Sequence, residues 1–143
     1  MIGTDENLPD NFMQMITPGI RPGDLYVASS ARHGRGVFAA RDFTPESTIE
    51  ICPVIVIPVA QRAAVDNTVL DEHCYEWDGA AGLALGFGSL YNHSYEPNAY
   101  YRQHVDRGLV IVTALKVVAK GEEITINYHG DPADRSPVWY ERT

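Results

Sequence analysis

The residues that could bind a ligand or do chemistry are concentrated in three short blocks. Asn92-His93-Ser94 is followed after two residues by Pro97-Asn98, and Gly121 to Tyr128 reads G-E-E-I-T-I-N-Y. The third block is Gly34-Arg35-Gly36, directly before an apolar run. Glycines at this spacing let backbone approach a ligand closely or take positive φ angles. An asparagine can anchor a polar ligand, and a tyrosine hydroxyl can orient a reacting group.

Together the blocks resemble the signature motifs of SET-domain lysine methyltransferases, which have the forms N-H-S-x-x-P-N and G-E-E-I/L-x-x-x-Y. Gly34 to Ala39 resembles the G-x-G-h-F-A motif of the same family. All three stand in the family's order, whereas one motif alone would be weak evidence. The resemblance covers Asp24 to Tyr140 and is closest to the minimal stand-alone proteins of bacteria and large DNA viruses. The run Ala84 to Gly88 is typical of these.

The resemblance implies that the chain uses S-adenosyl-L-methionine. In the family the glycine turn lies around the methionyl part of this cofactor, so Gly34, Arg35 and Gly36 are predicted to bind it. Asn92 is predicted to hold the amino-acid end, and His93 to contribute backbone contacts near the adenine. Taken alone, the glycine block and the Asn92-His93 pair would each be read as an ordinary turn. A turn does not account for Pro97-Asn98 or for the block that ends at Tyr128.

Tyr128 is the first catalytic candidate and is also expected to contact the cofactor. The resemblance places its hydroxyl beside the transferred methyl group, at the mouth of a narrow lysine channel. A lysine ammonium has a pKa of about 10.4, so roughly one in 10³ is nucleophilic at neutral pH. An apolar channel lowers that pKa. Oxygen atoms then orient the amine and contact the methyl carbon. The alternative is a strand-end tyrosine that only packs.

Two further tyrosines are catalytic candidates. Tyr75 matches a family strand whose tyrosine lines the channel, with core packing as the alternative. Ile126 stands where the family often has a phenylalanine or tyrosine that tunes the number of methyl groups. Tyr101 is predicted to bring a hydroxyl to that end of the channel, hold a water and favour monomethylation. Packing in a hairpin is the alternative for Tyr101. Trp139 is predicted to cover the channel and contact the cofactor.

No metal site is expected. The five histidines lack ligand spacing, and no cysteine follows Cys74 to supply the three-cysteine zinc site of many chromatin relatives. Cys52 and Cys74 allow at most one disulfide. The net charge of -8 argues against direct nucleic-acid binding. It suits a basic partner, with the maintenance of solubility as the alternative. No apolar run is long enough to span a membrane. We expect a cytoplasmic protein, or one delivered to a host cell if its source is a pathogen or virus.

The elements that must position these residues are mostly short strands. Strands are predicted at 25–28, 36–39, 48–57, 73–77, 100–105, 109–114 and 123–128. Pro53 indicates an edge strand or a bulge, and Pro58 begins a short helix that ends near Asp66-Asn67. The fold class is therefore mostly β. The SET resemblance implies several small curled sheets with a threaded, pseudoknot-like C-terminal segment.

We predict an N-terminal extension at 1–23, a SET domain at 24–130 and a channel-covering segment at 131–143. The favoured function is a protein-lysine N-methyltransferase acting on a lysine-containing protein or peptide, with a basic histone-like tail among the candidates. One alternative is a non-catalytic SET-like module that binds a peptide or S-adenosyl-L-methionine. Another is an unrelated β-rich carbohydrate- or pilus-associated domain. The oligomeric state is left open, with a homodimer among the alternatives.

Overall fold

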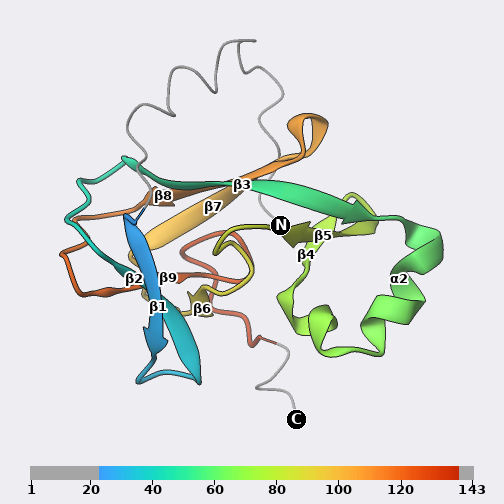
Figure 1. Ribbon diagram of the computed structural model, residues 1–143, viewed down its shortest axis with the longest axis horizontal. Helices are drawn as coiled ribbons and strands as arrows, with labels where there is room; N and C mark the ends of the chain where they lie inside the picture. The colour runs from blue at the N-terminus through green and yellow to red at the C-terminus, as the bar shows by residue number, and fades with distance from the viewer. Residues whose placement is uncertain (1–22, 139–143) are drawn as a thin grey trace.

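The computed structural model describes residues 23–138, which form two β-sheets (Figure 1). The smaller sheet has the strand order β1-β2-β9-β6, and the larger has the order β4-β5-β3-β8-β7. The strands of the smaller sheet are β1 (Leu25–Ser29), β2 (Arg35–Ala39), β6 (Asn92–His93) and β9 (Glu123–Ile126). Those of the larger are β3 (Thr48–Ile57), β4 (Tyr75–Trp77), β5 (Ala80–Ala84), β7 (Ala99–His104) and β8 (Leu109–Ala114). The mostly β prediction is confirmed.

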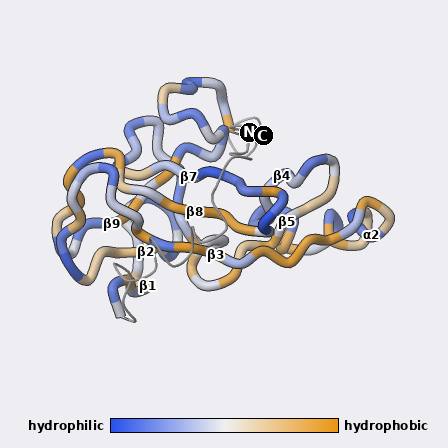
Figure 2. Tube along the Cα trace, turned by 90° about the horizontal axis from the view of Figure 1, so that it is seen from above, coloured by the Kyte–Doolittle hydropathy of each residue, from blue (hydrophilic) through white to orange (hydrophobic). Residues whose placement is uncertain are grey.

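Three short helices complete the described chain: α2 (Val59–Asp66) and the 3₁₀ helices η2 (Val69–His73) and η3 (Val105–Arg107). The long strand β3 runs from the side of the smaller sheet to the opposite end, where α2 lies (Figure 1). In Figure 2 an apolar stretch follows β3 toward α2. No helix among residues 23–138 is long and apolar enough to cross a membrane.

Strand β8 explains where the core lies. Its sequence LVIVTA is rich in β-branched residues, and all but Thr113 are buried. It pairs antiparallel with β3 on one side and with β7 on the other. The β7–β8 hairpin was predicted, and Gly108 ends its η3 connection with a left-handed φ of 64°. The buried cluster around β8 includes Tyr101, Ile126 and Tyr91, so the core reaches the predicted catalytic residues.

Pro53 was predicted to mark an edge strand or a bulge, and this is wrong. It lies in β3, the middle strand of the larger sheet, and the register shift in β3 falls between Thr48 and Glu50 instead. Pairing of β3 with β5 begins only at Val54. The carbonyl of Pro53 accepts from Leu85 N at 2.8 Å, so its nitrogen faces the point where β5 has already ended. The missing N–H therefore costs no ladder hydrogen bond.

The predicted strand over 73–77 is only partly right. Residues up to His73 belong to η2, and β4 begins at Tyr75. The predicted strand over 123–128 ends at Ile126, so Tyr128 lies just beyond β9. Other predictions match closely, since β3 occupies 48–57 and α2 has Pro58 and Asn67 as its flanking residues.

Candidate active site

The first and second motif blocks lie side by side because β6 and β9 pair in parallel. Asn92 is opposite Thr125 and His93 is opposite Ile126. The amide of Asn98 supports this pairing, since its Nδ2 donates to Glu123 O at 2.8 Å and its Oδ1 accepts from Thr125 N at 2.9 Å. One buried side chain thus satisfies two backbone groups of β9.

The glycine turn is attached to the same two strands through Asn92. Asn92 Nδ2 lies within donor distance of His33 O (3.2 Å), Arg35 O (2.9 Å) and Glu123 Oε2 (2.9 Å). Gly34 has a φ of 50°, which favours glycine. A Cβ on Gly36 would stand 2.5 Å from Glu123 Oε2, so this glycine is needed for the close approach of β2 to β9.

A cavity of about 550 Å³, which we call the turn cavity, lies between this turn and β6. Five of the seven residues predicted to bind the cofactor line it: Gly34, Arg35, Asn92, His93 and Tyr128. Gly36 is buried and does not line the turn cavity. Trp139 lies outside the described residues. The carbonyls of His33 and Arg35, which Asn92 Nδ2 holds in place, suit the ammonium of an amino-acid end, so these residues fit S-adenosyl-L-methionine.

A second cavity of about 350 Å³, the tyrosine cavity, contains all three predicted catalytic residues. Tyr75, Tyr101 and Tyr128 line it together with Ile126. Tyr75 and Tyr101 pack edge to face with ring centroids 5.0 Å apart. Five residues line both cavities, namely Glu72, His73, Ser89, Tyr91 and Tyr128. The two cavities therefore meet at Tyr128.

The hydroxyls of the three predicted catalytic tyrosines each donate to a backbone carbonyl. Tyr128 donates to Tyr91 O at 2.8 Å, Tyr75 to Gly88 O at 2.7 Å and Tyr101 to Tyr128 O at 3.0 Å. Tyr128 N also donates to His93 Nδ1 at 3.0 Å, which gives the His93 side chain a structural role. These hydrogen bonds fix the positions of the tyrosine rings, because they connect residues from several different segments of the chain.

Three buried phenols around the cavity, those of Tyr75, Tyr91 and Tyr101, stay neutral. Burial raises the pKa of Tyr75 and Tyr91 well above the ordinary value, with neighbouring groups adding to the effect. Burial also raises the pKa of Tyr101. A neutral phenol keeps the proton that it donates in a hydrogen bond and cannot act as a phenolate base near pH 7. The site is thus built for orientation and desolvation of a bound group.

Sequence reasoning missed several residues of the site. Tyr91, Ser89 and His73 border both cavities, and the carbonyl of Ser89 lies 2.9 Å from His73 Nδ1. The segment Ser89-Leu90-Tyr91 precedes Asn92 directly, and that proximity was the available signal. Acidic residues also line the tyrosine cavity and were not assigned there: Asp71, Glu72, Glu76 and Asp134.

Neither a disulfide nor a metal-binding cluster is found in the part of the chain that the structure covers. Cys52 and Cys74 are free thiols, and burial raises the pKa of the Cys52 thiol far above its usual range. Among residues 23–138 no group of three or more His, Cys, Asp or Glu side chains could hold a metal ion.

Comparisons with known proteins agree with this geometry. A family model described as the SET domain matches residues 34–129. A histone-lysine N-methyltransferase of Schizosaccharomyces pombe, specific for H3 lysine-37, is 35% identical over 129 residues, covering 89% of this chain and 83% of that protein. A crystal structure of a candidate histone methyltransferase of Plasmodium falciparum is 31% identical with a TM-score of 0.61, covering 82% of this chain and 96% of that one. The chain therefore belongs to the SET domain family.

Proposed function

We propose that this protein transfers a methyl group from S-adenosyl-L-methionine to a substrate lysine held in the tyrosine cavity. The activity of a lysine methyltransferase follows from family membership and from the fission-yeast relative. The observation that supports the finer proposal is the meeting of two cavities at Tyr128. A methyl donor in the turn cavity and an acceptor lysine in the tyrosine cavity would face each other beside the Tyr128 hydroxyl.

The turn cavity would hold the cofactor. Asn92 and the carbonyls of the glycine turn would bind the amino-acid end, and the backbone near His93 would border the adenine. The bound cofactor supplies an electrophilic methyl group on a sulfonium. Residues of the chain place this group at the junction, where in-line transfer gains chiefly from positioning.

The tyrosine cavity would hold the lysine. Its aromatic walls and Ile126 remove water from the side chain, which favours the neutral amine. The oxygens of Tyr128 and of the carbonyl groups beside it orient the nitrogen and contact the methyl hydrogens. The lysine loses its proton to solvent, the nitrogen forms a bond to the methyl carbon, and the electron pair of the broken carbon–sulfur bond stays on sulfur.

We further propose a basic, histone-like protein tail as the substrate. The yeast relative acts on histone H3. The carboxylates at the tyrosine cavity and the net charge of -8 favour a positively charged peptide.

The test combines calorimetry with a methyl-transfer assay on histone-tail peptides read by mass spectrometry. We expect cofactor binding, and we expect Asn92→Ala to weaken it by about tenfold or more, since a buried polar anchor contributes roughly 1–3 kcal/mol. Asn67→Ala is the control, because its amide also donates to a carbonyl but lies at the end of α2, outside both cavities. Binding without transfer to any lysine substrate would favour the non-catalytic module. Equal affinity of Asn92→Ala and wild type would remove the turn cavity from cofactor binding.

A further inference from the structure

The loop over residues 85–91 forms one wall of the tyrosine cavity through its carbonyl groups. Gly88 O accepts from the Tyr75 hydroxyl, Ser89 O lies 2.9 Å from His73 Nδ1, and Tyr91 O accepts from the Tyr128 hydroxyl. Side chains from β4, from η2 and from the segment after β9 are therefore all placed by this one loop. Where the loop lies decides where these side chains lie.

A carboxylate on β3 holds this loop at two points. Glu50 Oε2 accepts from Phe87 N at 2.9 Å, and Glu50 Oε1 accepts from the Tyr91 hydroxyl at 2.8 Å. Burial, and next the charge of Glu50, raise the pKa of Tyr91, so the phenol keeps the proton that it donates. Hydrogen bonds to an ionised acceptor are stronger than neutral ones. A single side chain thus joins the middle and the end of the loop to β3 of the larger sheet.

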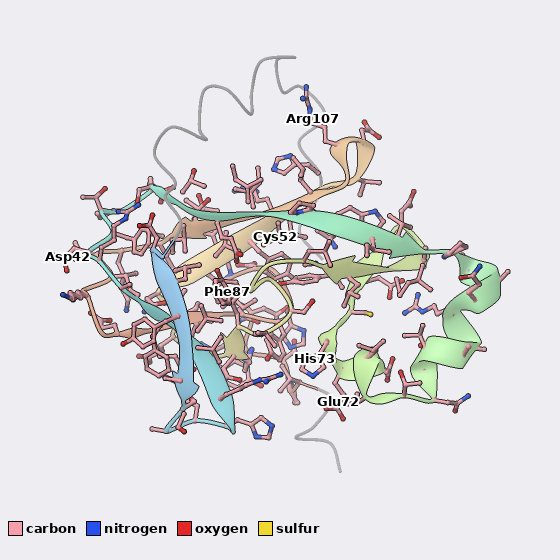
Figure 3. All side chains as sticks on the ribbon, viewed as in Figure 1. Asp42, Cys52, Glu72, His73, Phe87 and Arg107 are labelled. Atoms are coloured by element: carbon pink, nitrogen blue, oxygen red, sulfur yellow. The ribbon has the colours of Figure 1, made fainter. Side chains whose placement is uncertain are left out.

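Two glycines let the loop lie directly against β3. Gly86 has a φ of 67°, and a Cβ there would overlap Glu50 Oε2. A Cβ on Gly88 would stand 2.7 Å from Cys52 Sγ, two residues further along β3 and on the same face as Glu50. Figure 3 shows Cys52 and Phe87 near the middle of the molecule, below β3. Because the loop lies directly against β3, a change in the Glu50 side chain alters the position of the loop directly.

Resting on the proposed methyl transfer, we propose that Glu50 is a positioning residue for this reaction. Its carboxylate sets the position of the loop carbonyls, and these carbonyls orient Tyr75, His73 and Tyr128 around the substrate amine. Glu50 lines neither cavity, so it acts through the loop and not by contact with substrate or cofactor.

The test compares Glu50→Ala with Glu50→Gln. The alanine variant loses both loop bonds, and we expect kcat to fall by at least about tenfold, since loss of alignment acts on the chemical step. The cofactor Kd should rise less than kcat falls, because the loop borders the turn cavity only through Ser89 to Tyr91, whereas the glycine turn is held by its own hydrogen bonds to Asn92. Glutamine keeps an oxygen for Phe87 N and presents an amide to the Tyr91 oxygen, so it should restore kcat to within about threefold of wild type.

The matched control is Glu46→Ala. Glu46 accepts a 2.7 Å hydrogen bond from the Tyr100 hydroxyl, the same chemistry as Glu50 with Tyr91, but both residues lie outside the two cavities. Its kcat should match wild type. If Glu50→Ala does not fold, Tyr91→Phe removes one of the two loop bonds and should lower kcat in the same direction. Wild-type kcat in folded Glu50→Ala, or in Tyr91→Phe where the alanine variant does not fold, would overturn the proposal.

Amide hydrogen exchange of Phe87, measured by NMR, gives a readout that does not depend on activity. The Phe87 amide should be protected in wild type and in Glu50→Gln, and should exchange much faster in Glu50→Ala. If the Phe87 amide exchanges fast in Glu50→Ala but the wild-type protein does not transfer methyl groups, the proposed function would be contradicted and the role of Glu50 as the loop anchor would stand. An active wild type whose Phe87 exchange does not respond to Glu50→Ala would overturn the anchor alone.

Discussion

At the scale of single residues, the hydroxyls of Tyr75, Tyr101 and Tyr128 share one arrangement. Each donates its proton to a backbone carbonyl, as Tyr128 does to Tyr91 O. A phenol oxygen whose proton is used in this way takes the role of acceptor toward a bound amine. The carbonyls therefore do more than hold the rings, because in the proposed reaction they would leave the phenol oxygens free to accept from the substrate amine.

Tyr128→Phe tests this role directly. The ring should still pack against His93, whose ring centroid lies 5.2 Å away, so the melting temperature and the cofactor Kd should change little. Loss of the hydroxyl should lower turnover by at least about tenfold. Tyr100→Phe is the control, since its hydroxyl bonds Glu46 outside both cavities. Steady-state kinetics and calorimetry measure both effects, and wild-type turnover in Tyr128→Phe would move the catalytic role to another residue.

Tyr101→Phe tests control over the number of methyl groups. Tyr101 is 1% exposed, lines the tyrosine cavity and donates to Tyr128 O at 3.0 Å. If its hydroxyl holds a water where a second methyl must fit, wild type gives mainly monomethyl-lysine. The variant should then shift the products toward di- and trimethyl-lysine. Mass spectra of the product peptide decide this, and mainly trimethyl product from wild type would count against the hydroxyl.

The motifs made several site residues predictable, whereas others depend on tertiary contacts. Gly34, Asn92 and Tyr128 stand in recognisable blocks, and the structure brings them to one cavity. Glu50 could not be found in this way, because it lies in an apolar strand 37 residues before Phe87 and its partner there is a backbone amide. A sequence pattern does not reveal which backbone group a side chain will meet.

At the scale of elements, the parallel pairing of β6 with β9 brings the site together. This pairing is only two residues long, so it depends on side chains such as Asn98. We expect Asn98→Ala to lower the free energy of unfolding by about 1–3 kcal/mol, since it removes the side-chain partner of the buried Thr125 N and of the partly buried Glu123 O. Urea denaturation measures this change, with Asn67→Ala at the exposed end of α2 as the control. A loss no larger than that of Asn67→Ala would contradict the role of Asn98.

Elements with strong local patterns were predictable, and those set by side-chain caps were less so. The β-branched run of β3 and the proline before α2 gave correct bounds. Residues 69–73 form a 3₁₀ helix because Thr68 Oγ1 accepts from Leu70 N at 3.2 Å. Because of this capping bond, His73 belongs to η2, and β4 begins at Tyr75 and not at His73 as predicted. The error matters for function, since it places His73 on η2 beside the junction of the cavities.

At the scale of the whole molecule, the buried phenols make stability depend on pH. The folded state raises the pKa of Tyr75, Tyr91 and Tyr101. Their stabilising contribution is complete below the unfolded value of about 10 and is lost as the pH rises above it. Turnover should rise toward pH 9 as the free amine becomes commoner, whereas the melting temperature should fall above about pH 10. Calorimetric scans and initial rates check both, and a melting temperature unchanged to pH 11 would contradict the buried phenols.

Charge also acts over the whole molecule, and under the proposed function a net charge of -8 would attract basic substrates from a distance. Near the site, Asp71, Glu72 and Asp134 line the tyrosine cavity, while Glu76 is bound by Arg62 at 2.7 Å. Screening shortens such attraction to about 10 Å at 0.1 M salt. The KM of a peptide with basic residues beside its lysine should therefore rise several-fold between about 0.05 and 0.5 M salt, with kcat nearly constant.

Two controls separate this effect from general salt inhibition. A peptide with neutral residues beside its lysine should show little salt dependence. Glu72→Gln should raise the KM of the basic peptide at low salt, whereas Asp106→Asn, in the exposed η3 turn outside both cavities, should not. Equal salt slopes for the basic and the neutral peptide would show that the carboxylates at the cavity do not select the substrate, and recognition would then depend on the shape of the tyrosine cavity.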